Sequence, residues 1–118
     1  AQNNLGIIYC EGKYIQRDIN KAIYFFSLAA NQNISHSQFF LGLIYYDEEY
    51  LHRDINKAIH YFRLAADLKH SYAQYYLGEI YYEGEYIEQN INKSIHYLTL
   101  AADQNHPGAQ FDLGFIYH

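Results

Sequence analysis

Histidine has the widest chemical repertoire of any residue type in this chain, because imidazole binds metals and transfers protons near neutral pH. The sequence has seven histidines, and His60 and His96 lie 36 residues apart. If the two occupy equivalent places on adjacent packed helices, roughly 8–10 Å separates them. A zinc site takes at least three protein ligands, and no third ligand falls at a recognised spacing. The histidines therefore predict no metal site.

The other residues that carry chemistry form no complete constellation. The sequence has no glycine-rich phosphate loop and no recognisable pairing of a nucleophile with a base. Two triplets, Asn33-Ile34-Ser35 and Asn92-Lys93-Ser94, fit the glycosylation pattern, which matters only in the secretory pathway. Cys10 is the single cysteine and cannot form an internal disulfide. A lone cysteine and the lack of a signal-peptide pattern favour a cytoplasmic location. We expect no enzyme activity and no cofactor.

The charge balance bears on the possible partners. The formal net charge is −5 and the pI is near 5.7, which argues against a nucleic-acid surface, since such a surface needs clustered lysine and arginine. No apolar run approaches the roughly 18 residues of a membrane span, so we expect no membrane insertion. Eight acidic residues gather near the predicted loops, and they indicate either a basic partner or a solvated rim. They are Glu11, Asp47, Glu48, Glu49, Glu79, Glu83, Glu85 and Glu88.

All of these residues lie within a segment that repeats along the chain. The pattern Leu-Gly-x-x-Tyr begins at Leu5, Leu41, Leu77 and Leu113, with a constant period of 36 residues. Fixed periods of this length are typical of proteins that stack copies of one supersecondary unit. We divide the chain into repeats at 1–36, 37–72 and 73–108 and a partial repeat at 109–118, which together form one repeat domain, 1–118. Because the chain lacks an initiator Met and begins and ends within the repeat, we expect it to be a piece of a longer protein.

Each repeat is predicted to contain two helices. In the first repeat, apolar residues recur with helical spacing over about 1–10 and again over about 19–31. Asp18, Asp54 and Asn90 stand where short polar side chains cap the second helix of each repeat. Asn33 and Asn105 are expected to end that helix, because asparagine tolerates the left-handed conformation. The pattern predicts an all-α solenoid of 36-residue helix-turn-helix repeats, with three full repeats and one extra helix.

The repeat resembles the Sel-one-like repeat (SLR) family, a branch of the tetratricopeptide-like helical solenoids. The family pattern is approximately A-x-x-x-L-G-x-x-Y-x-x-G, a short loop, and then D-x-x-K-A-x-x-(aromatic)-x-x-x-A-A. In the second copy the matching residues are Leu41, Gly42, Tyr45, Asp54, Lys57, Ala58, Tyr61, Ala65 and Ala66. The resemblance implies a right-handed superhelix with the first helix of each repeat on its concave side. It also implies an adaptor or scaffold role in protein complexes and no catalytic residues.

The face of each first helix opposite its apolar stripe is rich in aromatic residues, where an ordinary surface helix is polar. We predict that this face forms a concave groove that receives a peptide or helix of a partner protein. The alternative is that the rings stack between successive repeats. Phe39, Tyr46 and Tyr82 are the predicted anchors. The predicted groove residues are Phe39, Leu43, Tyr46, Tyr75, Glu79, Tyr82, Phe111 and Phe115.

These patterns favour a non-catalytic scaffold or adaptor that binds a protein or peptide. The alternative is a regulatory repeat module of a larger enzyme or signalling protein whose catalytic domain lies elsewhere. The outer face of the second helices carries a further row of residues, represented by Lys21, Tyr24 and Leu28, which could be a second interface or an ordinary covered surface. Apolar end faces of the repeat stack also predict some end-to-end self-association.

Overall fold

The computed structural model describes residues 18–47 and 53–118. The predicted first helix, about 1–10, lies outside the described residues, as do Cys10, Glu11, Glu48 and Glu49. The chain divides into two compact units, Ala1–Tyr61 (unit 1) and Phe62–His118 (unit 2).

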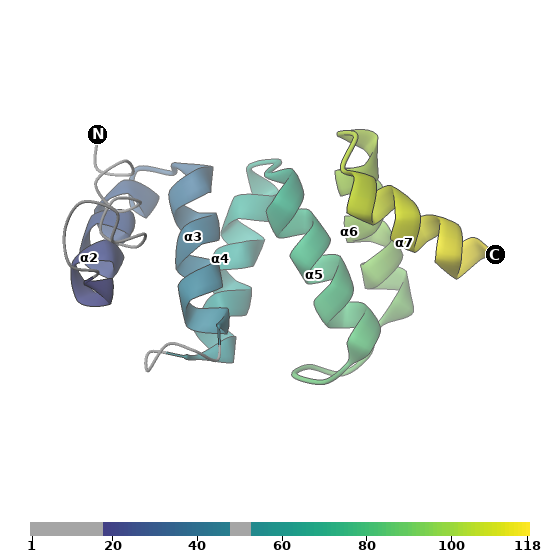
Figure 1. The fold of residues 1–118 in the computed structure, drawn as a ribbon, viewed down its shortest axis with the longest axis horizontal. Helices are drawn as coiled ribbons and strands as arrows, with labels where there is room; N and C mark the ends of the chain where they lie inside the picture. The colour runs from purple at the N-terminus through teal and green to yellow at the C-terminus, as the bar shows by residue number, and fades with distance from the viewer. Residues whose placement is uncertain (1–17, 48–52) are drawn as a thin grey trace. The chain divides into compact units, whose positions relative to one another are not determined.

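The described residues form six α-helices and no strand, labelled as in Figure 1. The helices alternate between the first and the second helix of successive repeats, as the 36-residue period predicts. Their bounds are α2 Ile19–Ala30, α3 Ser35–Tyr46, α4 Ile55–Asp67, α5 Ser71–Glu83, α6 Ile91–Asp103 and α7 Pro107–Tyr117. The boundary between the two units falls within α4.

The second helix of each repeat begins at the predicted capping residue. The Asp18 carboxylate accepts a hydrogen bond from the Lys21 backbone N–H at 3.1 Å, and Asn90 accepts one from the Lys93 N–H at 3.0 Å. Asp54 accepts from the N–H of Lys57 at 3.2 Å. Each cap satisfies one of the backbone donors that the first turn of a helix leaves free.

The turn after each of these helices contains one residue in the left-handed conformation. Asn33 has φ 61° and Asn105 has φ 67°, which confirms the predicted role of both asparagines. Lys69 takes the same place in the middle repeat with φ 66°, although a lysine gains nothing from its side chain there. Backbone hydrogen bonds close all three turns in the same way, so the geometry of the turn overrides the local preference of Lys69.

Unit 1 is built on the packing of α2 against α3, which lie side by side in Figure 1. Ala22 and Phe26 of α2 are fully buried and contact Leu41 of α3. The Phe26 ring stacks on Phe40 with centroids 5.3 Å apart. The small residue lets the two helices approach, and the large ring fills the space beside it.

Unit 2 is built on the packing of α5 against α6, the two helices of the third repeat. Gly78 of α5 lies against Leu98 of α6, and the Ser94 hydroxyl donates a 2.7 Å hydrogen bond to the Gly78 carbonyl. Tyr81, the tyrosine of the Leu-Gly-x-x-Tyr pattern, is buried and stacks on Tyr97 with centroids 6.0 Å apart. The repeated pattern therefore marks the buried side of α5, as its sequence predicts.

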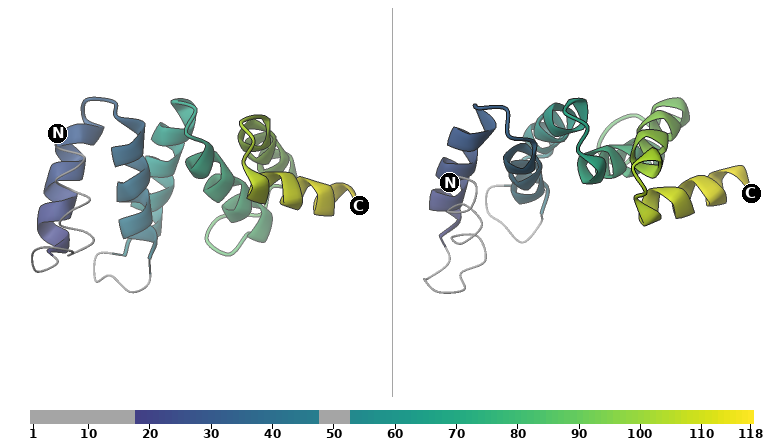
Figure 2. Two further views of the ribbon diagram at one scale, coloured as in Figure 1. Left: turned by 45° about the horizontal axis from the view of Figure 1, so that its top comes forward. Right: turned by 90° about the horizontal axis from the view of Figure 1, so that it is seen from above.

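Helix α7 is covered on one side only by the helices of its unit. Ala109 is buried with Leu98 and Ala101 of α6, whereas Phe115 is 70% exposed. Figure 2 shows α7 extending away from α6 with no described helix of unit 2 over its far side.

Candidate functional site

In unit 1, the predicted groove residues differ in burial. Phe39 is only 8% exposed and lies beside Phe40, with the ring centroids 5.9 Å apart. Phe39 is therefore part of the core of unit 1. This burial favours the alternative, in which the ring packs between helices, over a role as a groove anchor. Leu43 and Tyr46 are partly exposed.

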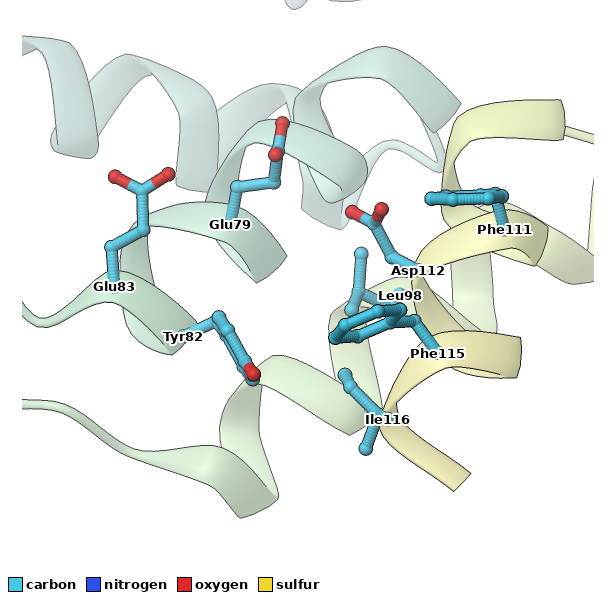
Figure 3. Close-up of a pocket in the computed structure, with 8 residues that line it drawn as sticks. All are labelled: Glu79, Tyr82, Glu83, Leu98, Phe111, Asp112, Phe115 and Ile116. Atoms are coloured by element: carbon cyan, nitrogen blue, oxygen red, sulfur yellow. The ribbon is translucent and has the colours of Figure 1, made fainter. Parts of the chain in front are cut away.

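In unit 2, the predicted residues come together at a pocket. Glu79, Tyr82, Phe111 and Phe115 line an open pocket of about 300 Å³ that α5, α6 and α7 enclose. Figure 3 shows the eight residues that line it. Four of them are not among the predicted groove residues: Glu83, Leu98, Asp112 and Ile116.

Helix geometry explains why these side chains share one pocket. Glu79, Tyr82 and Glu83 of α5 stand at i, i+3 and i+4, so they project from one face. Phe111 and Phe115 of α7 are separated by one helical turn in the same way. Leu98 of α6 fits against α5 because Gly78 has no side chain, and so it can contribute to the pocket from below α5 and α7.

The aromatic residues of the pocket present much of their surface to solvent. Phe111 is 72% exposed and Phe115 is 70% exposed, while Tyr82 is 40% exposed. Single exposed apolar side chains are common on soluble proteins, but several around one concavity indicate a surface that contacts something else.

Tyr75, the remaining predicted residue of unit 2, is half-buried and contacts Glu79 of the pocket. Its ring stacks on His106 with centroids 4.5 Å apart, and its hydroxyl donates a hydrogen bond to the Glu79 carboxylate. Burial and the neighbouring Glu79 raise the pKa of the Tyr75 hydroxyl, so Tyr75 remains a hydrogen-bond donor at neutral pH.

Two carboxylates of the pocket, those of Glu79 and Asp112, are held where ionisation is unfavourable. Burial raises the pKa of Glu79; the negative charges of Asp112 and Glu83 raise it further, and the hydrogen bond from Tyr75 opposes the shift. Burial also raises the pKa of Asp112, and His106 opposes that shift. Three acidic groups within one pocket therefore carry a repulsion that a bound cation would relieve.

The two histidines that lie one repeat apart, His60 and His96, are on the outer surface of their helices. His60 and His96 are exposed, and each ring lies edge-on against the tyrosine that follows it, with centroids 5.3 Å apart. Within residues 18–47 and 53–118, no group of three histidine, cysteine, aspartate or glutamate residues is placed to hold a metal ion. No helix in this part of the chain is long and apolar enough to cross a membrane.

The predicted row on the outer face of the second helices is also partly exposed. Tyr24 is 60% exposed, and Leu64 and Leu100 are each 37% exposed. The hollows of unit 2 lined by Glu79 and Tyr82, by Gln110 and Phe111, and by Arg63 and Lys93 include none of these side chains, so they offer a weaker candidate surface than the pocket between α5, α6 and α7.

The sequence model of the family described as "Sel1 repeat" matches residues 1–34, 35–70 and 71–106. These ranges cover most of the chain, and each range after the first begins where the first helix of a repeat begins. The chain belongs to the Sel1 repeat family. Sel1 repeats are generally protein-interaction scaffolds and are typically non-catalytic. An all-α helical solenoid, as the repeat pattern predicts, is therefore confirmed.

Two solved structures show the same fold. The chain is 35% identical to a Sel1 repeat protein from Oxalobacter formigenes, with a TM-score of 0.85 over 95% of this chain and 32% of that one. It is 25% identical to c5321, a protective antigen of uropathogenic Escherichia coli strains that displays an SLR fold, with a TM-score of 0.92 over 98% of this chain and 25% of that one. The chain thus spans a third or less of the length of each of these two proteins. No curated protein matches it.

Proposed function

We propose that this Sel1 repeat chain is a non-catalytic protein-binding module whose pocket in unit 2 receives a peptide or a helix of a partner protein. The observation that carries the proposal is the exposure of Tyr82, Phe111 and Phe115 around one concavity. Aromatic rings supply a large contact area with few torsions to order, and tyrosine adds a polar tip. The family supports the proposal because Sel1 repeats generally mediate protein interactions.

A selection from a library of random peptides tests this function and requires no assumption about the identity of the partner. The purified chain is the bait, and the affinity of each enriched peptide is measured by isothermal titration calorimetry. We expect the double variant Tyr82→Ala/Phe115→Ala to weaken binding at least about tenfold, because truncation of an aromatic anchor typically costs about 1–4 kcal/mol.

Tyr24→Ala is the control, since it removes from the other unit an aromatic ring whose 60% exposure lies between those of Tyr82 and Phe115. Circular dichroism spectra verify that all variants retain their helices. The proposal fails if no peptide is enriched, or if the double variant binds the enriched peptides as tightly as the Tyr24→Ala variant does.

A further inference from the structure

The pocket of unit 2 combines aromatic walls with an uncompensated negative charge. Residues 62–118 contain seven aspartates and glutamates against three lysines and arginines. Three of the carboxylates, those of Glu79, Glu83 and Asp112, line the pocket. None of the eight lining residues is a lysine, an arginine or a histidine, and His106, outside the lining, opposes the rise in the pKa of Asp112.

The basic residues of unit 2 are placed on other surfaces. Arg63 donates a hydrogen bond to the Tyr81 hydroxyl, and the Lys93 ammonium lies over the Tyr81 ring, 5.3 Å from its centroid. Both line a separate hollow with Glu88 and Asn90. Lys69 is exposed in the turn between α4 and α5. The chain therefore supplies no lysine or arginine of unit 2 to the acidic pocket.

The carboxylates and the Tyr82 ring occupy different sides of the pocket. In Figure 3 the carboxylates of Glu79, Glu83 and Asp112 extend toward one side, and the Tyr82 ring lies on the other with Ile116. An occupant that matches this arrangement needs an apolar stem and a positively charged head. Lysine and arginine side chains have this form, because their methylene stems cover apolar surface while their heads remain in polar surroundings.

We propose that the pocket binds a lysine or arginine side chain presented by the partner peptide, with its stem against Tyr82 and Phe115 and its charged head at Glu79 and Asp112. This inference rests on the proposed function and names the chemistry that the site selects. Charge-assisted hydrogen bonds to carboxylates and contact of a cation with aromatic faces both favour such an occupant over a neutral one. The raised carboxyl pKa values agree, since a bound cation offsets the cost of ionised groups in this place.

Titration with small probes tests the charge preference directly. The probes are N-acetyl-arginine amide, N-acetyl-lysine amide and N-acetyl-citrulline amide, the last being a neutral analogue of nearly the same shape as the arginine probe. Binding is followed by amide chemical shifts of the isotopically labelled chain. We expect the two basic probes to shift residues of α5 and α7, and the citrulline probe to bind at least about fivefold more weakly.

Substitutions assign the preference to the carboxylates. Glu79→Gln/Asp112→Asn should weaken the basic probes about fivefold to tenfold and leave the citrulline probe unchanged. Glu85→Gln is the matched control, because Glu85 is an exposed acidic residue outside the pocket and its loss changes the net charge alone. Raising the salt concentration from about 50 to about 300 mM should weaken the basic probes and spare the neutral one.

The outcomes separate this inference from the proposed function. Equal affinity for the arginine and citrulline probes, or shifts confined to residues outside α5, α6 and α7, would overturn the inference. If the peptides selected from the library depend on Tyr82 and Phe115 but lack basic residues, the protein-binding function stands and the basic specificity is wrong. If the basic probes bind at the pocket but the library yields no enriched peptide, the preference for a basic side chain stands and the peptide-binding function is wrong.

Discussion

Gly78 and Gly114 occupy the same position in successive Leu-Gly-x-x-Tyr segments, but their surroundings differ. A Cβ atom at Gly78 would lie 2.6 Å from Cγ of Leu98 and 3.3 Å from the Ser94 carbonyl oxygen, whereas nothing lies within 4 Å of the same point at Gly114. Leu98 is almost fully buried and has little room to move. The glycine is therefore required where the next helix is present, and identity between repeats does not imply an identical role.

We expect Gly78→Ala to lower the free energy of unfolding by about 1–3 kcal/mol, because the added methyl group overpacks the contact with Leu98. Gly114→Ala should raise it by up to about 1 kcal/mol, because alanine favours a helix and meets no neighbour. Urea denaturation followed by circular dichroism measures both. Equal changes in the two variants would show that helix propensity, and not close approach, governs this position.

Glu79 should make the fold less stable at neutral pH than a neutral residue does. Its pKa in the fold is raised by burial and by Asp112 and Glu83, while Tyr75 opposes the shift. A carboxyl group whose pKa is raised on folding stabilises the fold at pH values below its pKa in the unfolded chain. This contribution is lost as the pH rises through the pKa of the group in the folded chain. Leu98, the neighbour from α6, carries no charge.

The expected result is that Glu79→Gln stabilises the chain at pH 7 by about 0.5 kcal/mol, since the site is partly open to solvent and screened. The advantage should shrink as the pH falls from 7 to about 4.3, the ordinary pKa of glutamate, because the raised pKa lets the folded wild-type carboxyl group take up its proton within this range. Thermal unfolding across this pH range measures the difference, with Glu85→Gln as a control for net charge. An advantage independent of pH would rule out ionisation as its cause.

At the scale of the helices, most boundaries follow from sequence. Polar caps and the 3.6-residue periodicity predict the starts of α2, α4 and α6, because these signals are local. The starts of α5 and α7 carry a cap that sequence reasoning missed. His70 and His106 accept hydrogen bonds through Nδ1 from the backbone N–H groups of Ala73 and Ala109, at 3.3 and 3.1 Å. Histidine is not a usual capping residue, so composition gives no signal there.

Burial along the first helices is harder to predict than their position in the chain. Phe39, Tyr75 and Phe111 share one repeat position, yet the first is buried, the second is half-buried and the third is 72% exposed. A helical wheel gives all three the same direction and does not describe the neighbouring helices. The pocket could not be predicted for the same reason. The sequence shows that Glu79 and Glu83 are one helical turn apart, but their approach to Asp112 depends on how α5, α6 and α7 pack.

Lys69 is the weak point among the three equivalent turns. Its φ of 66° lies in the left-handed region, which costs a residue with a Cβ atom about 1 kcal/mol. We expect Lys69→Asn to stabilise the chain by roughly 0.5 kcal/mol and Lys69→Gly by up to about 1 kcal/mol. Thermal unfolding measures both, and Asn105→Gly should gain less from the same change. A loss of stability in both Lys69 variants would show that the lysine makes a favourable contact that outweighs the strain.

At the scale of the whole molecule, self-association remains a prediction. Helix α7 exposes Phe115 and Tyr117, which are 70% and 71% exposed, and rings on an uncovered face favour contact with another apolar surface. We expect the weight-average mass from sedimentation equilibrium to rise with concentration, and to rise less in Tyr117→Ser. A mass that stays at that of the monomer over the accessible range would exclude association through this face.

The repeat architecture also predicts how the free energy of folding is distributed. Each core lies between neighbouring helices, with Phe26 between α2 and α3 in unit 1 and Leu98 among α5, α6 and α7 in unit 2. In repeat proteins, stability is close to a sum of such local terms. A cavity in one unit should therefore loosen that unit before the other.

We expect Phe26→Ala, which removes a fully buried ring, to cost about 3–5 kcal/mol and to speed hydrogen exchange in α2 and α3 by about a hundredfold or more. Leu98→Ala should give the mirror pattern, with faster exchange in α5, α6 and α7. Hydrogen–deuterium exchange read by mass spectrometry resolves the two regions. If either variant speeds exchange equally across both units, the chain unfolds as one cooperative body, and the local contacts described for each unit do not govern its stability separately.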